Sequence, residues 1–527
     1  MEFQNDTAIQ FERNQKFLDK ATASKPKLQY DTIVPNRLVK IVKDEAKLFG
    51  YEAVTDDKAM QDLTTYSFGR NEQLVFDLGT HYVGKFSVDL TSVGAPMDAP
   101  LYIQLIFAEQ PVEIGDVNKP YTGLLSQSWL QEEYIHLDTL PAKLELDRRY
   151  ACRYVAIKVI DTSPKWQVQF SNPKFIAESS VTMTQVKPVK TGDLELDKID
   201  AVSLKTLHDC MQDVFEDGPK RDRRLWLGDL RLQALANYAS FDNQQLVKRC
   251  LYLFGGMPTV DGKISANVFT KPHDIPDNTF LYDYSLFFTS ILFDYYQQYQ
   301  DQETLIDLYP VAKTSIDLAL TLVDSQGLLH LDKGWPVFID WAQDFDKTTS
   351  AQAVLIYALK QFIELAQIKT DPDISKYQAQ LTLLVSASQE QLFDKATRLF
   401  VSGPERQVNI ASQCWMVLAG VLPDAGNYQL MTKTIAELFP VKGVATPYMY
   451  HHIDEALFKS GHKEEAVKLL KDYWGAMVHY GADTFWEAFK PEQPDFSPYN
   501  SLAINSFCHA WSCTPTYLIR KYLLGND

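Results

Sequence analysis

The 527-residue chain has few cysteines and no long apolar run. Its six cysteines lack the tight spacing of a disulfide framework or a zinc site, and we expect the nearest pair, Cys508 and Cys513, to be small core residues. No stretch approaches the ~20 apolar residues of a membrane span. The first residues also lack the basic and apolar regions of a secretory signal. These absences predict a cytoplasmic protein in a reducing setting, with no membrane partner and no bound metal.

Positive charge is also scarce. The chain holds 51 Lys and Arg against 68 Asp and Glu, a formal net charge of -17. Nucleic acids and anionic membranes require clustered cations, so both are excluded as expected partners. Aromatic residues, in contrast, are abundant, with 29 Phe, 27 Tyr and 9 Trp. Most of them must fill cores, but Tyr and Trp also stack on sugar rings.

The first third of the chain shows an apolar period of two. In "GKFSVDL" the residues Phe86, Val88 and Leu90 fall on one face, and turn signals such as "DLGTH" and "SNPK" separate the runs. The same alternation places Ile103, Leu105 and Phe107 together, and Val155, Ile157 and Val159 together. We predict an N-terminal antiparallel β-sandwich domain over residues 1–190.

The rest of the chain, residues 191–527, shows a helical period. Helices are expected at 195–212, 229–247, 281–299, 303–324, 350–368, 374–392, 408–421, 426–438, 449–459, 463–476, 498–510 and 514–524. Helices in such number, joined by short connections, suit antiparallel hairpins closed into an (α/α)6 toroid. An α-solenoid is the alternative, although no fixed-period repeat supports it. The Gly/Pro/Asp-rich loop 255–280 is long enough to be functional.

One charged stretch stands out, "EDGPKRDRRLWLGDLR" from Glu216 to Arg231. It connects two expected helices, and Asp229 occupies the position of an N-cap for the second. Pairing between its arginines and carboxylates would make an ordinary salt-bridged turn. That interpretation does not explain Pro219 and Trp226 among the charges, which favour a site that needs several carboxylates close together.

Two later segments add candidate residues. Glu487 in "GADTFWEAF" lies at a helix boundary, where complementing a helix dipole is the simpler explanation. His509 in "NSFCHAW" is expected on a helix among apolar neighbours, where a core histidine is the simpler explanation. In "DKGWPVFIDWAQ", Trp335 and Trp341 flank Asp340, which suits a sugar platform or a packed corner. Two carboxylates from different hairpins, near tryptophans, are what glycosidic hydrolysis requires.

These segments resemble glycoside hydrolase family 78, the α-L-rhamnosidases. "DGPKRDRRLWLGD" is similar to the family pattern D-x-P-x-R-(D/E)-x-x-x-W-x-G-D. "GADTFWE" and "NSFCHAW" resemble its A-T-T-x-W-E and N-S-x-x-H segments, and "FDLGTHYVGKFSV" resembles the β-sandwich that precedes its (α/α)6 domain. The motifs occur in the family's order and extend over most of the chain.

The resemblance implies hydrolysis of terminal α-L-rhamnose from small rhamnosides, with inversion and without a cofactor. It assigns the general acid to Asp222 and the general base to Glu487. It further assigns the sugar pocket to Asp217, Arg221, Trp226, Asp229, Trp335, Trp341 and His509. Many members carry Glu where this chain has Asp222, so the shorter acid either approaches the sugar more closely or acts through a water.

Alternatives to this interpretation stay open. Another (α/α)6 exo-glycosidase or a phosphorylase would use the same architecture, and a non-catalytic sugar-binding protein would bind without turnover. A purely structural role for the motifs predicts that Glu487 points into solvent. The β-domain is expected either to form the surface of a homodimer or to contribute a loop to the rim of the active site.

Overall fold

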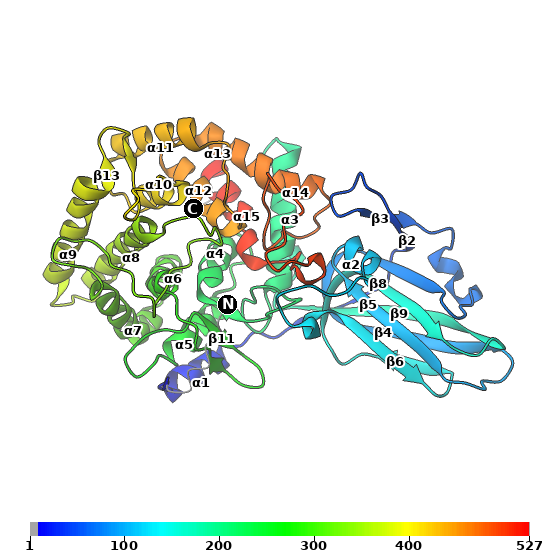
Figure 1. Ribbon diagram of the computed structural model, residues 1–527. Coiled ribbons are helices and arrows are strands. Elements are labelled where there is room, and N and C mark those ends of the chain that lie inside the picture. The colour runs from blue at the N-terminus through cyan, green and yellow to red at the C-terminus, as the bar shows by residue number, and fades with distance from the viewer. Residues whose placement is uncertain (1–8, 526–527) are drawn as a thin grey trace.

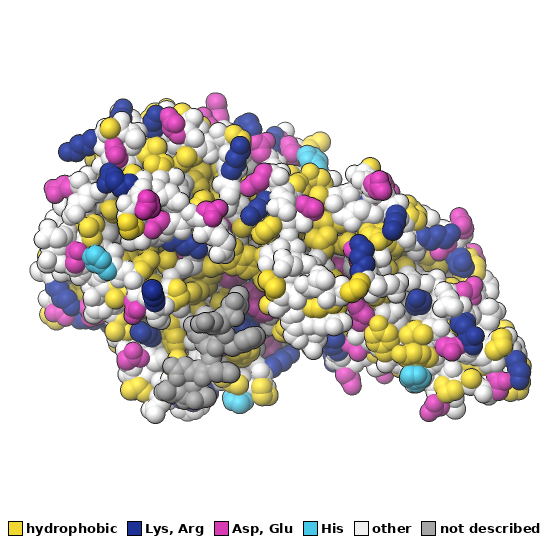
Figure 2. Space-filling view, in the orientation of Figure 1, with side chains coloured by type: hydrophobic (Ala, Val, Ile, Leu, Met, Phe, Trp, Pro, Cys, Tyr) yellow, Lys and Arg dark blue, Asp and Glu magenta, His cyan; other side chains and the backbone are white. Residues whose placement is uncertain are grey.

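The computed structural model describes residues 9–525 and places an antiparallel sheet before a large helical part (Figure 1). This order confirms the predicted division into a β-rich and an α-rich region. Helices α3 and α14 lie on the side of the helical part that faces the sheet. Figure 2 shows charges of both signs spread over the face in view, and hydrophobic side chains gathered in the hollow of the helical part.

The sheet is organised around one long strand, β4. Its strands are β1 (Gln29–Ile33), β2 (Arg37–Lys43), β3 (Tyr51–Thr55), β4 (Gln73–Gly94), β5 (Leu101–Ala108), β6 (Glu132–Leu137), β7 (Ala142–Glu145), β8 (Tyr150–Asp161) and β9 (Trp166–Ser179). The first half of β4 pairs with β2 and β8, and the second half with β7 and β9. The register of β4 on β8 shifts between Asp77 and Tyr82, so the sheet is irregular at that point.

The alternation seen in the sequence is confirmed by burial. The alternating residues of β4, β5 and β8 share one hydrophobic core: Phe86, Val88, Leu90, Ile103, Leu105, Phe107, Val155, Ile157 and Val159. Because side chains alternate across a strand, these residues share one face of the sheet, while Val75, Ile106 and Ala156 on the opposite face belong to a second, smaller core.

The helical part is built from pairs of helices in contact. Its helices are α3 (Leu194–Cys210), α4 (Leu227–Tyr238), α5 (Gln244–Gly255), α6 (Tyr282–Tyr299), α7 (Gln302–Leu320), α8 (Thr348–Ile368), α9 (Ile374–Ala387), α10 (Ile410–Leu418), α11 (Asp424–Leu438), α12 (Pro447–Lys459), α13 (Lys463–Leu470), α14 (Ala476–His479) and α15 (Pro515–Leu518). Helices α4, α6, α8, α10 and α12 each contact the next, and α15 contacts both α12 and α4. Most expected helices agree with these bounds within a few residues.

Three local predictions are wrong. Asp229 is not an N-cap, because α4 begins at Leu227 and its cap position is Trp226. The helix expected over 229–247 is two helices, since the chain turns through Asp242 in the left-handed region (φ 52°). No α-helix forms over 498–510, where His509 is extended (φ -134°, ψ 131°). In that segment the backbone N–H groups of His509 and Ala510 donate to Phe485 and Asp217, which replaces helical hydrogen bonds.

The segment ahead of the sheet and the long loop 255–280 also contain regular secondary structure. An N-terminal helix, α1 (Gln15–Ala23), packs on α5, so residues ahead of the sheet contact the helical part. The domain boundary at residue 190 stays a prediction. Within the Gly/Pro/Asp-rich loop, β11 (Asn267–Phe269) pairs with β10 (Leu225–Trp226) and β12 (Ile275–Pro276). This small sheet attaches the loop to the charged stretch.

Disulfide bonds and membrane-spanning helices are absent from the described residues. The six cysteines all lie in the described part of the chain, where each is buried and free. Across residues 9–525, the helices are too short or too polar to cross a membrane.

A buried ionic network joins the sheet to the helical part. His81 of β4 hydrogen-bonds Asp209 of α3 through Nδ1 (2.6 Å) and Glu109 through Nε2 (3.0 Å). Burial alone would lower the pKa of His81, but neighbouring Cys508, Asp209 and Glu109 raise that pKa to about 10. The other oxygen of Glu109 accepts from the backbone N–H of Phe507 (2.7 Å). A protonated His81 therefore bridges two carboxylates that belong to different parts of the fold.

Lys220 extends this network into the charged stretch. Its side chain is 1% exposed, and its ammonium group donates to Glu113 (2.6 Å), from the short helix α2 (Pro111–Gly115). It also donates to the backbone carbonyls of Ala503 and Asn505, both at 2.9 Å. The sheet domain thus supplies a counter-charge for the loop that carries Asp217 and Asp222.

The His81 bridge yields a prediction about stability. Replacing His81 by Gln removes the cation that Glu109 shares with Asp209, and Lys205 (2.5 Å) still pairs with Asp209. Breaking a buried ion pair typically costs about 3–5 kcal/mol. We expect the midpoint of thermal unfolding, followed by circular dichroism, to fall by several degrees. The exposed Lys143 pairs with the exposed Glu145, so Lys143→Gln serves as a control that leaves the midpoint in place. An unchanged midpoint for His81→Gln would contradict this role.

Candidate active site

The charged stretch forms a buried turn whose backbone is held at several points. Asp217 is 3% exposed; its Oδ1 accepts from the N–H of Arg224 (3.0 Å) and its own N–H donates to the Arg224 carbonyl (3.0 Å). Its carbonyl accepts from the N–H of Ala510 (2.7 Å). A Cβ at Gly218 would lie 2.7 Å from the carbonyl oxygen of Arg221, so the tight turn requires glycine. The turn and the segment around Ala510 therefore position each other.

Arg221 connects the turn to Glu487. Its Nη2 donates to Oε2 of Glu487, and its Nε donates to the carbonyl of Ile504 (2.7 Å). Tyr499 donates its hydroxyl to Oε1 of Glu487 (2.6 Å), and its ring centroid lies 4.3 Å from the guanidinium of Arg221. Both oxygens of Glu487 are thus occupied by donors. Glu487 is buried, which contradicts the interpretation in which it points into solvent.

Asp222 occupies a different environment beside the same arginine. Its Oδ1 lies 3.9 Å from Nη1 of Arg221, and its side chain is 23% exposed. Asp222 also lines a cavity of about 680 Å³ that opens where the sheet meets the helical part. One guanidinium therefore stands between a buried carboxylate and a carboxylate that faces a cavity.

Asp229 and His509 complete the buried cluster. Oδ1 of Asp229 lies 3.6 Å from Nδ1 of His509, and within residues 9–525 neither atom has a hydrogen-bond partner. Nε2 of His509 lies 4.0 Å from carboxylate oxygens of Asp217 and of Glu487. Buried polar atoms are nearly always satisfied, so these two atoms indicate a place for a polar ligand.

The electrostatics follow from burial of like charges. Burial raises the pKa of Asp217, and Asp222 and Asp229 raise it further. Burial and then Glu487 raise the pKa of Asp229. Burial also raises the pKa of Glu487, but Arg221 and the Tyr499 hydroxyl oppose that shift. Asp217 and Asp229 are thus biased toward the protonated form, in which a carboxyl group can donate to a ligand hydroxyl.

His509 is biased toward the neutral form. Burial lowers its pKa well below the usual value, and Arg221 lowers it further. A neutral imidazole carries one donor and one acceptor nitrogen, which suits a hydroxyl group.

An aromatic wall lies next to the carboxylates. Trp511 donates its Nε1–H to the carbonyl of Glu487 (2.9 Å) and stacks on Phe338, with ring centroids 5.8 Å apart. Trp341 meets Trp511 at 5.8 Å and Tyr499 at 5.4 Å. The sequence motifs did not point to Tyr499, Trp511 or Phe338. Trp511 and Phe338 lie close in the sequence to predicted residues, in "CHAW" and "WPVFIDW", and this proximity could have identified them.

Trp226 and Trp335 lie less directly on the cluster. Trp226 meets Tyr284 edge-on, with centroids 6.4 Å apart, and a Cβ at Gly228 would lie 2.3 Å from the Tyr284 ring. Tyr284 thus packs against Trp226 and against the first turn of α4, which carries Asp229. Trp335 packs on Tyr282 at 5.1 Å, and in the described chain no hydrogen bond, ion pair or ring contact joins it to the carboxylates.

Asp340, between the two tryptophans, has a structural environment. Its carboxylate accepts from the backbone N–H groups of Ala342, Ala445 and Thr446, at 2.7–3.1 Å. It also accepts from the Thr446 hydroxyl. Asp340 therefore attaches the Trp341 loop to the start of α12.

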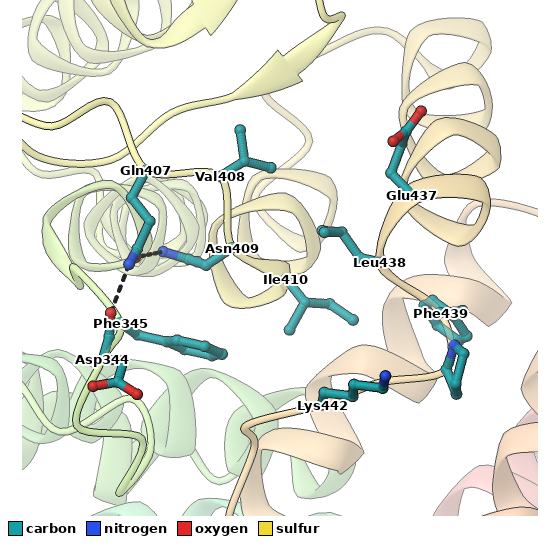
Figure 3. A pocket seen from close by; sticks show the side chains of 11 residues that line it. Asp344, Phe345, Gln407, Val408, Asn409, Ile410, Glu437, Leu438, Phe439 and Lys442 are labelled. Atoms are coloured by element: carbon teal, nitrogen blue, oxygen red, sulfur yellow. Dashed lines mark hydrogen bonds between the residues drawn. The ribbon is translucent and has the colours of Figure 1, made fainter.

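Two other features lie outside the cluster. Ligand-type atoms of His81, Asp209 and Cys508 lie within 4.8 Å of one another, the only such group in the described residues, but both nitrogens of His81 already hydrogen-bond carboxylates. Figure 3 shows a separate pocket of about 350 Å³ between Gln407, Phe345 and Lys442, where Gln407 hydrogen-bonds Asn409 and the Asp344 carbonyl. None of the predicted site residues lines that pocket.

Comparison with known families bears directly on this cluster. The model of the glycosyl hydrolase family 78 alpha-rhamnosidase N-terminal domain matches residues 35–177. The model of the bacterial alpha-L-rhamnosidase 6 hairpin glycosidase domain matches residues 184–523. The chain belongs to glycoside hydrolase family 78. The resemblance found in the sequence is confirmed, and the protein is a glycoside hydrolase of the α-L-rhamnosidase family.

Solved structures agree with this family 78 assignment. A rhamnosidase from Klebsiella oxytoca with rhamnose bound is 43% identical, covers 98% of this chain and 100% of its own, and superposes with a TM-score of 0.94. The family 78 rhamnosidase of Bacillus sp. GL1 and the alpha-L-rhamnosidase of Streptomyces avermitilis share the fold at 20% and 17% identity, with TM-scores of 0.73 and 0.65. The chain spans about half the length of those two longer proteins (50% and 44%), and the matches cover 90% and 94% of this chain. A search among curated protein sequences gives no match.

Proposed function

We propose that this enzyme removes terminal α-L-rhamnose from small rhamnosides by a single displacement with inversion. The observation that carries the proposal is the placement of Arg221 between Asp222 and Glu487. Inverting hydrolysis requires one carboxyl group to protonate the leaving oxygen and a second to activate water on the opposite face of the sugar. Two carboxylates in contrasting environments, on either side of one arginine, suit this division of roles.

Glu487 is the general base in this proposal. A base must be ionised to accept a proton, and the charged form of Glu487 is favoured by Arg221 and by the Tyr499 hydroxyl. Water adds its oxygen to the anomeric carbon and transfers one proton to Glu487.

Asp222 is the general acid. Its partial exposure and its place on the wall of a cavity leave it accessible to the glycosidic oxygen of a substrate. As the glycosidic bond breaks, the carboxyl proton of Asp222 moves to that oxygen, and the leaving group departs as an alcohol. Asp222 then regains a proton and Glu487 loses one through solvent, which restores the enzyme.

The sugar occupies the buried side of Arg221. The free atoms of Asp229 and His509 face each other there and would bond ring hydroxyls, together with Asp217. The wall of Trp341, Trp511 and Phe338 offers an apolar surface for the methyl group of a 6-deoxy sugar. Trp226 contacts Tyr284 beside this pocket, and Trp335 packs on Tyr282 farther from it.

The architecture we propose is a β-sandwich followed by an (α/α)6 toroid, with residues 1–190 and 191–527 as the two domains. Support for the toroid comes from the successive contacts of α4, α6, α8, α10 and α12 and from the contacts of α15 with α12 and α4. The six hairpins named by the matching family model agree with it.

Removal of either carboxylate tests the assignment of roles. We expect Asp222→Asn and Glu487→Gln each to lower kcat for nitrophenyl α-L-rhamnoside by about 10²–10⁴-fold or more, the range for general acid–base groups. The exposed Glu390 serves as a control, since Glu390→Gln should keep full activity. Circular dichroism checks that each variant is folded. Near-full activity in either carboxylate variant would refute its assigned role.

Stereochemistry gives a separate test. Proton NMR during hydrolysis of the nitrophenyl rhamnoside should show the β anomer of rhamnose first, with the α anomer appearing only by mutarotation. The reaction should need no phosphate, which distinguishes hydrolysis from phosphorolysis. Initial release of the α anomer would establish retention instead.

Tyr499→Phe tests the base through its pH dependence. Without the Tyr499 hydroxyl, the carboxylate of Glu487 loses a hydrogen bond that holds its pKa down, so that pKa should rise. The base must be ionised, so the acidic limb of the kcat/KM profile should move to higher pH, with the largest loss at low pH. An acidic limb at the wild-type position would argue that Tyr499 has no such effect on Glu487.

A further inference from the structure

The cavity of about 680 Å³ beside Asp222 carries unusual charge for this protein. Its walls come from both parts of the fold, with Trp129 and Arg149 on the sheet side and Arg223 and Phe269 on the helical side. Six cations line it, Lys85, Arg148, Arg149, Arg223, Arg224 and Lys271, against four acids, Asp147, Glu178, Glu216 and Asp222. The cavity therefore carries excess positive charge on a chain whose net charge is -17, and this excess favours a negatively charged ligand in the cavity.

Two of the six cations are already neutralised. Arg149 pairs with Glu216 (2.6 Å) and Glu178 (3.6 Å), and Arg148 pairs with Glu133 (3.1 Å). These pairs use two of the four acids that line the cavity.

Arg223 and Arg224 have no such partner. In the described part of the chain, no carboxylate lies within ion-pair distance of either guanidinium. Arg224 stacks over the Phe269 ring at 4.2 Å, and its buried Nε lacks a hydrogen-bond acceptor. Arg223 donates to the backbone carbonyls of Lys220 (3.3 Å) and Arg149 (2.9 Å). Burial and the nearby Arg149 lower the pKa of Arg223 to about 10, which reflects unbalanced positive charge.

The position of Asp222 indicates which part of a substrate would enter this cavity. A general acid protonates the oxygen of the leaving group, so that group must lie on the Asp222 side of the scissile bond. Asp222 lines the cavity, whereas Asp217, Asp229, Glu487 and His509 do not. The cavity therefore lies on the leaving-group side, and its volume suits a single sugar residue.

We propose that this cavity binds the leaving group and selects a sugar that carries a carboxylate, such as a hexuronic acid. Arg224 and Lys271 bind the carboxylate, and Trp129 and Phe269 provide apolar surface for the ring. The proposal rests on the proposed function, because the cavity is a leaving-group site only if Asp222 is the acid.

Two substrates that differ only in charge provide the test, rhamnosyl-glucuronic acid and its methyl ester. They share the linkage and the leaving hydroxyl. We expect kcat/KM for the acid to exceed that for the ester by about tenfold or more, the factor expected for one charge-assisted hydrogen bond. The preference should shrink as sodium chloride is raised, because salt screens charges in an open cavity.

Substitution of the cavity cations shows which residues cause the preference for the acid over the ester. Arg224→Gln and Lys271→Gln should each reduce the acid-to-ester ratio toward one, a comparison that is insensitive to general loss of activity. Lys433 is remote from the cavity and pairs with Glu437, so Lys433→Gln should leave the ratio unchanged. Lys271 is exposed, so its variant should fold even if Arg224→Gln does not.

The outcomes separate the two proposals. Equal kcat/KM for acid and ester in the wild-type enzyme, or an unchanged ratio in both variants, overturns the acidic leaving-group site while rhamnosidase activity remains. If no rhamnose is released from these substrates or from the nitrophenyl rhamnoside, the proposed function fails and the inference fails with it.

Discussion

The contact between Arg221 and Glu487 is the interaction on which the rest of the site depends. Three carboxyl groups, Asp217, Asp229 and Glu487, are buried in one small volume, and burying carboxylates is unfavourable unless they are paired or hydrogen-bonded. Arg221 supplies the counter-charge for Glu487 and also binds the Ile504 carbonyl. The consequence is a graded set of acids: burial raises the pKa of all three, and at Glu487 the charge of Arg221 and the Tyr499 hydroxyl oppose that rise, whereas the pKa values of Asp217 and Asp229 lie well above the usual range.

That arrangement requires support from the sheet domain. Lys220, next to Arg221 in sequence, is buried and depends on Glu113 for its counter-charge, and Glu109 binds the backbone at Phe507. The sheet is therefore a structural partner of the site loops. It also forms one wall of the cavity beside Asp222, which places a residue of each domain within reach of a leaving group. The relative from Klebsiella oxytoca, which covers both parts of this chain, is consistent with such a joint unit.

Much of the fold could be predicted because its signals are local. Period-two runs such as Phe86, Val88 and Leu90 and the apolar faces of the helices report burial directly. The motifs pointed to Asp222, Glu487 and His509, which lie close to Arg221 or to one another in the structure, and their roles stay a proposal. Tyr499 and Trp511 were missed because an aromatic residue is not distinctive by its type in an aromatic-rich chain, and for Trp511 only its place next to His509 could have marked it. The helix expected around His509 was wrong because long-range hydrogen bonds replaced the helical ones.

The sequence by itself determined the class of most segments, the family and which acidic residues are candidates for the site. Only the tertiary structure decided that Arg221 would pair with Glu487, 266 residues away, and that Asp222 would face a cavity while Asp229 is buried. The physical reason is that secondary structure follows from neighbours along the chain, whereas the charge state of a carboxyl group follows from its burial and from charges within a few ångströms. Those distances exist only after the helices and the sheet have packed together.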